Sequence, residues 1–304
     1  MKNVTLKQLR YFEALAQKGH FGHAAAACAI SQPALSVQIK ELEAELGLPL
    51  FERGPRSVRL TGFGETFRKR VTEILRSVDE LGDLARSVQG GHIGRLRLGI
   101  IPTIAPYLLP RLVGHLSAEF DGLDLHVRET LTPRLITELH DGRIDAAILA
   151  LPISEPALTE VALFDETFVL VRPDRDAAKP VPDGEALQKM RLLLLEEGHC
   201  FRDQALSFCK LGSAMPRDGL DGSSLTTLVQ MVGAGIGVTL IPEMAVAVET
   251  GAAQVSVAHF AEPQPARTIG MVWRKSSPMA EQFARIAEVV RRVGAAGGPQ
   301  PVHA

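Results

Sequence analysis

The spacing of apolar residues changes once along this chain of 304 residues, and the change fixes its organisation. Before residues 89–94, apolar side chains recur every three to four positions, which is typical of amphipathic helices. After this glycine-containing stretch, short apolar strand patterns alternate with helical ones, which indicates an α/β fold with a parallel sheet. A chain of this length can bury more than one core. The sequence therefore predicts a helical N-terminal part followed by a larger α/β part.

The N-terminal part has the pattern of a helix-turn-helix. Residues 6–18 carry apolar side chains at helical spacing, and Gly19 then ends the helix. A short alanine-rich helix over 21–28 follows, and Ser31 is a suitable N-cap for a third helix that reaches about residue 46. Two short helices joined by a tight turn are typical of DNA-binding domains. The outward face of the third helix carries Gln32, Pro33, Ser36 and Lys40.

Residues 50–60 predict a β-hairpin directly after this motif. Gly54 and Pro55 supply the turn, and arginines stand at 53, 56 and 59. A basic cluster by itself is more often a solvated loop. Its position after a helix-turn-helix favours a wing that faces DNA phosphates. The charges agree, because residues 1–90 hold 13 lysines and arginines against 10 acidic residues, whereas the remainder is net acidic.

A long helix is predicted after the hairpin. Its apolar residues at 67, 71, 74, 78, 81, 85 and 88 are spaced in steps of four and three, which is the seam of a coiled coil. A seam this narrow is thinner than the face that a helix buries against its own domain. We therefore expect it to pair with a second subunit, and a two-fold dimer also suits spaced DNA half-sites. The domain limits that follow are 1–62 for the winged helix-turn-helix, 63–90 for the linker helix and 91–304 for the C-terminal domain.

The C-terminal region alternates strands and helices. The predicted elements are strand 95–101, helix 106–120, strand 123–129, helix 134–141, strand 146–149, strand 191–196, helix 202–210, helix 224–234, strand 236–241, strand 268–274 and helix 279–293. No apolar run reaches the eighteen or so residues of a membrane span, and the first twenty residues lack the apolar core of a signal peptide. We therefore expect a cytoplasmic protein. Its three cysteines are too few for a structural disulfide framework, so any disulfide is expected to be transient.

The N-terminal part resembles the DNA-binding domain of LysR-type transcription regulators along the run LRYFEALAQKGHFGHAAAACAISQPALSVQIKELEAELGLPLFER and the following VRLTGFG. The resemblance implies a homodimer or homotetramer that binds double-stranded promoter DNA and works with RNA polymerase. It also implies a regulatory domain of two periplasmic-binding-protein-like lobes joined by crossing strands, about 91–165 with 266–304 and about 166–265. The same resemblance implies that Gln32, Pro33 and Ser36 approach base edges. It implies that Lys40, Arg53 and Arg56 hold phosphates.

Two segments of the C-terminal region resemble the OxyR branch of this family, the hydrogen-peroxide sensors: IPTIAPYLLP at 101–110 and EEGHCFRDQALSFC at 196–209. Most other LysR-type domains bind small organic acids. The resemblance implies that peroxide oxidises Cys200 to a sulfenic acid, that Cys209 then forms a disulfide with it, that a cellular thiol reductant reverses this, and that antioxidant genes are controlled. The positions that match the peroxide pocket are Thr103, Thr132, His199, Arg202, Asp203 and Arg267.

The residues themselves also favour a reactive Cys200. A thiol reacts as the thiolate, and His199, Arg202 and the start of a predicted helix all favour that form. Cys209 has apolar neighbours in the sequence, which suits a protected thiol. A lone cysteine is more often an inert packed residue, and Cys28 is expected to be one.

Other functions stay open at this stage. A LysR-type regulator could instead sense a small carboxylate between its lobes, and a thiol peroxidase could use Cys200 as nucleophile and Cys209 as resolver. The helix-turn-helix favours a regulator over an enzyme. A metal site at His199 and the cysteines lacks the usual ligand spacing, and the glycines at 233, 235 and 237 follow a helix instead of opening one, so no metal or cofactor is expected.

The spacing of the two cysteines predicts a conformational change. Cys200 and Cys209 are nine positions apart, and a continuous helix would separate their Cα atoms by about 13.5 Å. A disulfide needs Cα atoms within about 7 Å. We therefore expect the disulfide to unwind helix 202–210 and to shift contacts between subunits.

Overall fold

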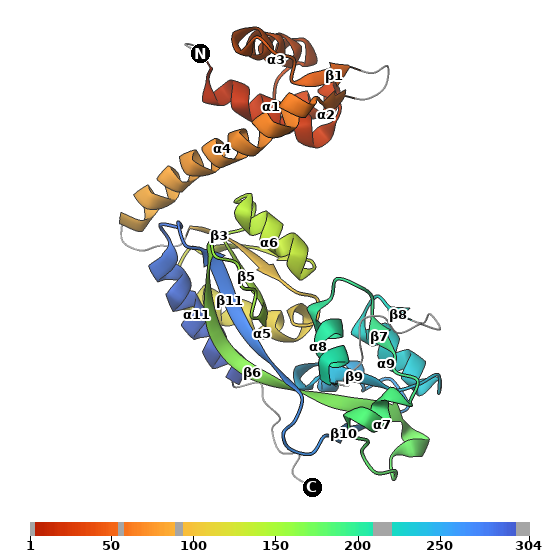
Figure 1. Cartoon of the computed structure of the whole chain (residues 1–304). Helices are drawn as coiled ribbons and strands as arrows, with labels where there is room; N and C mark the ends of the chain where they lie inside the picture. Colours follow the sequence, from red (N-terminus) through yellow and green to blue (C-terminus); the bar gives the residue numbers. More distant parts are fainter. Residues whose placement is uncertain (1–3, 54–57, 89–93, 209–220, 296–304) are drawn as a thin grey trace. The chain divides into compact units, whose positions relative to one another are not determined.

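The computed structural model describes residues 4–53, 58–88, 94–208 and 221–295. The chain divides into two compact units, Met1–Ala85 and Arg86–Ala304 (Figure 1). The predicted class is confirmed, because a helix-turn-helix with a short hairpin precedes an α/β unit. Among the described residues, no helix combines the length and the apolar character that crossing a membrane would need.

The N-terminal unit packs its helices around Phe12. The Phe12 ring centroid lies 5.3 Å from that of Phe51 and 5.1 Å from that of Phe67, so helix, hairpin and linker helix meet at one side chain. Leu35 and Ile39 are fully buried beside them. The elements are α1 (Leu6–Lys18), α2 (Phe21–Ala27), α3 (Gln32–Leu46), β1 (Phe51–Arg53), β2 (Val58–Leu60) and α4 (Gly62–Val88).

Local signals in the sequence set the helix ends. Thr5 and Gln8 form a capping box at the start of α1, and Gly19 ends that helix at φ +60°. Ser31 Oγ accepts a hydrogen bond from the backbone nitrogen of Ala34 at 3.3 Å and so caps α3. These ends agree with the sequence to within one or two residues.

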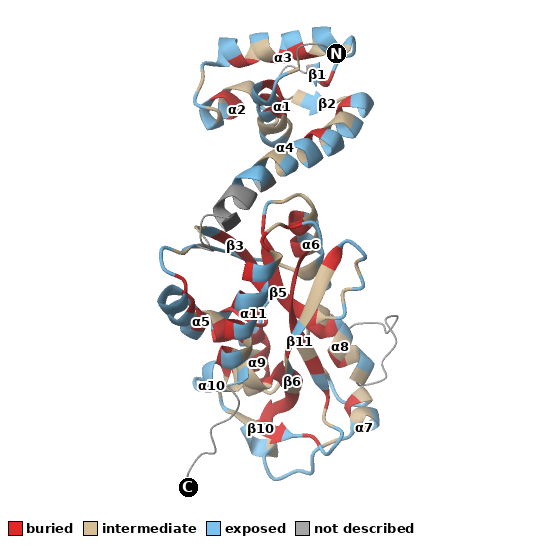
Figure 2. Ribbon diagram, turned by 90° about the vertical axis from the view of Figure 1, so that its left-hand side faces the viewer, coloured by how far each residue is buried: buried red, intermediate tan, exposed pale blue. Residues whose placement is uncertain are grey.

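The linker helix α4 is apolar on a face that its own unit covers only in part. Val71 is fully buried against the unit, but Ile74 is 45% and Leu81 64% exposed. In Figure 2 the described part of this helix is coloured mostly as exposed and intermediate residues. An uncovered apolar seam is what pairing with another helix requires. The pairing itself stays a prediction.

The larger sheet of the C-terminal unit is mixed, and the predicted parallel arrangement is confirmed for the strands that come first in this unit. Its strand order is β10-β6-β11-β5-β3-β4, and β9 also pairs with β6. Only β3 (Arg95–Ile100), β4 (Asp124–Glu129) and β5 (Ala146–Leu151) are parallel to one another. The other pairs are antiparallel: β11 (Ala266–Arg274) runs back between β5 and the long strand β6 (Leu158–Pro173), and β9 and β10 each run opposite to β6.

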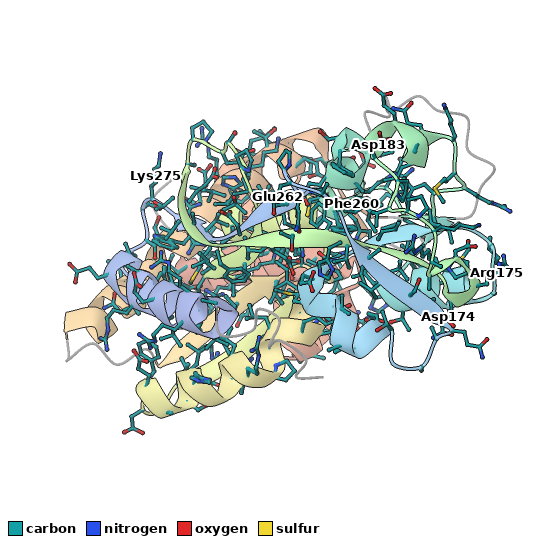
Figure 3. All side chains as sticks on the ribbon, turned by 90° about the horizontal axis from the view of Figure 1, so that it is seen from below. Asp174, Arg175, Asp183, Phe260, Glu262 and Lys275 are labelled. Carbon is teal, nitrogen blue, oxygen red and sulfur yellow. The ribbon has the colours of Figure 1, made fainter. Side chains whose placement is uncertain are left out.

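Strand β6 is long enough to contribute to two hydrophobic cores, whereas the buried side chains of β11 belong to the first. The first core lies among β3, β5, β11 and the helices α5 (Ala105–Glu119), α6 (Thr132–His140) and α11 (Ala280–Ala295). The second core contains Phe168 and Val169 of β6 together with side chains of other elements. Because β6 and β11 run in opposite directions, Asp174 after β6 and Lys275 after β11 lie at opposite ends of the unit (Figure 3).

The second core is completed by short elements between β6 and β11. They are α7 (Gly184–Gln188), β7 (Leu194–Leu195), α8 (Cys200–Phe208), β8 (Asp221–Gly222), α9 (Leu225–Gly233), β9 (Thr239–Pro242), α10 (Val246–Glu249) and β10 (Val255–His259). Helix α8 begins two residues earlier than predicted. The predicted strand 191–196 is reduced to β7 and an isolated bridge between Leu192 and Val238. The sequence did not predict β6, α7 or β10.

Candidate functional site

The first candidate surface is the start of α3. Leu35, Ile39 and Leu42 point into the core of the N-terminal unit, which fixes the opposite face of the helix outward. Four predicted DNA-contacting residues lie on this face. Gln32, Pro33 and Lys40 are exposed, and Ser36 is half-buried. Val37, which the sequence did not single out, is 51% exposed beside them. Its place on the same face as Pro33, four residues earlier, was the available signal.

The second candidate surface is the hairpin. Strands β1 and β2 pair antiparallel, with Glu52 opposite Arg59, and Arg59 is exposed. Arg53 lies on β1, but its side chain is not described, and Arg56 lies outside the described residues. The phosphate contacts predicted for these two arginines therefore stay predictions.

The third candidate site is a buried polar group between the two cores, where β11 crosses toward β6. Arg267 is 3% exposed, and its Nη1 donates to Thr103 Oγ1 at 2.9 Å while its Nη2 donates to the Thr103 carbonyl at 3.1 Å. Thr103 is also 3% exposed. The structure thus joins two of the predicted pocket residues, which are 164 positions apart in the sequence.

Glu166 balances the charge of Arg267. Its Oε2 lies 2.8 Å from Arg267 Nε and 2.7 Å from Nη2, and its Oε1 accepts from the backbone nitrogen of Met244 at 3.4 Å. Burial raises the pKa of this carboxyl group, although Arg267 and the hydrogen bonds act in the opposite direction. Glu166 was not among the residues predicted from the sequence.

A second buried carboxylate lies near this group. The Tyr107 hydroxyl donates to Glu249 Oε1 at 2.6 Å, and both residues are buried. Burial and the neighbouring Glu249 raise the pKa of Tyr107, while the positive charge of Arg267 opposes that shift. Tyr107 comes from α5 but packs in the second core, so this hydrogen bond also connects the two cores.

Thr132 has a buried hydroxyl with an unusual lack of partners in the part of the chain that the structure describes. It is the first residue of α6, and among the described residues its buried Oγ1 has no hydrogen-bond partner. The preceding residue Leu131 touches the loop before α8, since a Cβ atom added to Gly198 would lie 3.1 Å from Leu131 Cδ1. The start of α6 and the segment that leads to Cys200 are therefore in contact.

Cys200 opens α8 at the junction of the two cores. It is half-buried and packs against the first core, whereas its neighbour Phe201 is buried in the second. The Phe201 ring stacks edge-on with Phe168 at 4.8 Å, and the Arg267 guanidinium lies 5.4 Å from its centroid. One side chain beside Cys200 thus contacts the buried polar group directly.

The predicted site residues next to Cys200 in the sequence are His199, Arg202 and Asp203, and they differ in burial and in hydrogen bonding. Burial lowers the pKa of His199, so its imidazole is neutral near pH 7 and does not supply the positive charge that the sequence suggested. Arg202 is 2% exposed and donates to the carbonyl of Leu195. Asp203 is exposed on α8, and its predicted role in the pocket stays a prediction.

The remaining cysteines complete the comparison with the sequence. Burial raises the pKa of the half-buried Cys28 thiol, as an unreactive cysteine requires. Cys209 lies outside the described residues. No group of three or more histidine, cysteine or carboxylate side chains within the described ranges has the geometry of a metal site.

Comparisons with known proteins point in one direction. Residues 6–65 match the bacterial regulatory helix-turn-helix proteins of the lysR family, and residues 89–295 match the LysR substrate binding domain. A probable hydrogen peroxide-inducible genes activator from Streptomyces viridosporus is 42% identical, over 95% of this chain and 94% of its own.

Two solved structures are similar over nearly the full chain. A full-length cysteine-to-aspartate variant of OxyR from Pseudomonas aeruginosa is 38% identical with a TM-score of 0.76, covering 95% of this chain and 98% of its own. A cysteine-to-serine variant of OxyR from Corynebacterium glutamicum, bound to hydrogen peroxide, is 36% identical with a TM-score of 0.67. The match covers 97% of this chain and 94% of that chain.

Proposed function

Because the chain belongs to the LysR family of bacterial regulatory helix-turn-helix proteins, we propose that it is a transcription regulator that senses hydrogen peroxide through Cys200. The family is a class of regulators and not of enzymes. One observation carries the proposal: Arg267 holds the Thr103 hydroxyl in a buried polar group that also touches the residue next to Cys200.

The hydroxyl groups have the polarity that binding peroxide needs. Arginine can only donate, so Thr103 Oγ1 accepts from Arg267 and keeps its own hydrogen for another acceptor. Thr132 Oγ1 is buried with an unused hydrogen-bonding capacity, and such a group costs free energy unless a ligand or water satisfies it. Two such hydroxyls suit a small molecule with two oxygen atoms, each both donor and acceptor.

The proposed chemistry begins at the start of α8. The helix N-terminus favours a negative charge, which stabilises the Cys200 thiolate. The thiolate attacks one peroxide oxygen, the O–O bond breaks, and the departing hydroxide takes a proton to become water. This leaves a sulfenic acid on Cys200. The neutral His199 acts in this step by hydrogen bonding, not by charge, and Arg202 holds the preceding segment through Leu195.

The second step joins the cysteines. The Cys209 thiolate attacks the Cys200 sulfur, the S–O bond breaks, and the hydroxide that leaves is protonated to water. A thiol of the cell later reduces the disulfide. The length of α8 supports the predicted unwinding, because eight helical steps separate the Cα atoms of Cys200 and Phe208 by about 12 Å. The next residue can return by at most about 3.8 Å, still outside the disulfide limit of about 7 Å.

The DNA-binding part of the proposal rests on α3 and the hairpin. Gln32, Pro33 and Ser36 read base edges in the major groove, Lys40, Arg53 and Arg56 hold phosphates, and the exposed Val37 adds an apolar contact for thymine methyl groups. Helix α4 joins two subunits along Ile74 and Leu81. The proposed domain limits stay 1–62, 63–90 and 91–304, and cytoplasmic location, tetramer assembly and contact with RNA polymerase belong to the same proposal.

A footprint on the DNA upstream of the gene, with and without hydrogen peroxide, tests the function. Wild type and the control Cys28→Ser should change their footprint with peroxide, whereas Cys200→Ser should not. Hydrogen exchange over 200–208 should show loss of helical protection in the oxidised wild type and none in Cys209→Ser.

Two results would favour the other functions. If the change in the DNA footprint is retained when Cys200 and Cys209 are both replaced by serine, the protein is instead a sensor of small carboxylates. Sustained consumption of peroxide with a thiol reductant, at a rate far above one cycle per signal, would indicate a thiol peroxidase.

A further inference from the structure

The carboxylate of Glu166 is placed to control the geometry of the peroxide pocket from outside it. Arg267 uses one edge of its guanidinium, Nε and Nη2, for Glu166, and the Nη1 side for the Thr103 hydroxyl. The guanidinium is planar and rigid, so fixing one edge fixes the direction of the other. The side chains of Arg267 and Glu166 are 0% and 4% exposed, so water does not compete for these bonds.

Glu166 is itself anchored on both sides. Its Cα is the direct cross-strand partner of Arg267 in the β6–β11 ladder, and its second oxygen accepts from the backbone of Met244. Phe201 covers a face of the same guanidinium. The strand register and the hydrogen bond from Met244 hold Glu166, and the Phe201 ring covers the guanidinium. Together these contacts restrict the orientation of the Arg267 side chain.

We propose that Glu166 is a positioning residue for peroxide, which orients the Thr103 hydroxyl through Arg267 without touching the oxidant. The inference rests on the proposed function. Without the carboxylate, the buried guanidinium would lose the only counter-charge that contacts it among the described residues, and it would turn toward other acceptors. Thr103 Oγ1 would then lose its donor, and its own hydrogen would no longer be directed at the peroxide.

The same pair of strands supplies a matched control. One residue away, Asp165 Oδ1 accepts from Thr268 Oγ1 at 2.6 Å, and these residues are also cross-strand partners. This pair is exposed, because consecutive strand residues face opposite sides. Asp165→Asn therefore removes a carboxylate from the same ladder without reaching the pocket.

The test compares two reactions of the same thiol in the full-length protein. In a Cys209→Ser background, which stops at the sulfenic acid, the rate of Cys200 oxidation by hydrogen peroxide is measured by mass spectrometry of the trapped product. Alkylation of Cys200 by iodoacetamide is measured in parallel. Iodoacetamide needs the thiolate but not the oriented hydroxyl, so a merely structural or pKa effect would change both rates together.

Glu166→Gln should slow oxidation on the order of tenfold to a hundredfold, the size expected when a charge-assisted hydrogen bond is lost, with alkylation changed less than about twofold. Asp165→Asn should leave both rates unchanged. Thr103→Val should slow oxidation alone, and adding Glu166→Gln to it should cause little further loss, because both act through one hydroxyl.

Three results would overturn the inference: oxidation of Glu166→Gln at the wild-type rate, an equal fall in oxidation and alkylation, or effects of the two substitutions that simply multiply. If Glu166→Gln does not fold, Glu166→Asp keeps the charge but retracts the carboxylate. It should show the same selective loss, and a wild-type rate in that variant would leave Glu166 a structural role only. Failure of the proposed function is distinct, since the wild-type Cys200 itself would then react no faster with peroxide than a free thiol.

Discussion

Cys200 and Phe201 are neighbours in the chain, yet they pack into different hydrophobic cores of the C-terminal unit. The first turn of α8 therefore cannot rearrange without disturbing both cores. This position explains how a change at one sulfur atom could reach the rest of the unit, since packed cores have discrete arrangements and do not deform continuously.

Replacing Phe201 by alanine should destabilise the C-terminal unit by about 3–5 kcal/mol, because a fully buried aromatic side chain leaves a cavity. The single tryptophan, Trp273, is buried in this unit, so its fluorescence during denaturant unfolding reports on it selectively. Met190→Ala, at a position 38% exposed, is the control and should cost far less. Equal midpoints for the two variants would contradict the packing described for Phe201.

Thr132→Val should separate stability from function. No described residue hydrogen-bonds to this hydroxyl, so its removal should leave the free energy of unfolding unchanged or raise it by about 1 kcal/mol, while oxidation of Cys200 by peroxide slows on the order of tenfold. Thr239→Val is the matched control, because the buried Thr239 hydroxyl donates to the Leu193 carbonyl at 2.9 Å. That variant should lose about 1–3 kcal/mol of stability and keep its rate of oxidation.

Stability should fall on mild acidification because of His199. Burial lowers the pKa of this imidazole below its ordinary value of 6.5, so the unfolded chain binds the proton more readily than the folded one. The contribution is therefore complete above about pH 6.5 and is lost as the pH falls toward the folded pKa. Denaturant unfolding of wild type and His199→Asn across this range measures it, and the variant should give the flatter profile. His115→Asn, which removes an exposed histidine of the same unit, is the control.

Lys40→Ala should weaken binding to all DNA sequences by a similar factor. If Lys40 contacts one phosphate, the slope of log affinity against log salt should decrease by about 0.9. Ser36→Ala should instead change the preference between sequences. Lys189→Ala, at an exposed position in the C-terminal unit, tests for a general charge effect and should leave the slope unchanged. An unaltered slope in Lys40→Ala would remove this residue from the phosphate contacts.

The helices of the N-terminal unit could be predicted because residues next to their ends in the sequence determine where they begin and end. Ser31 directly precedes α3 and caps it by accepting from the backbone of Ala34, three residues later, and Gly19 ends α1 with its own backbone conformation. Strand β6 could not be predicted in the same way. The acidic residues Asp165 and Glu166 interrupt its apolar pattern, and Glu166 can be buried there only because Arg267, 101 positions later, neutralises it.

The same distinction applies to the candidate site. The sequence predicted a helix that starts at Arg202, two residues after Cys200, and family resemblance supplied Thr103 and Arg267. Tyr107 and Glu249 are 142 positions apart, and nothing near either residue in the sequence indicates the partner. Long-range pairs of this kind become visible only once the strands and helices are packed.

The route of the chain through β6 and β11 has a consequence for engineering. Thr167, near the middle of β6, and Ala266, the first residue of β11, are cross-strand partners, and the elements of the second core, apart from Tyr107, lie between them. Topologically, this segment is a single insert whose two ends face each other across one ladder. A chimera in which a relative's segment replaces this one needs two junctions, and both lie at the same place in the sheet. There the backbone pairing of β6 with β11 would hold the inserted segment and the rest of the chain in register.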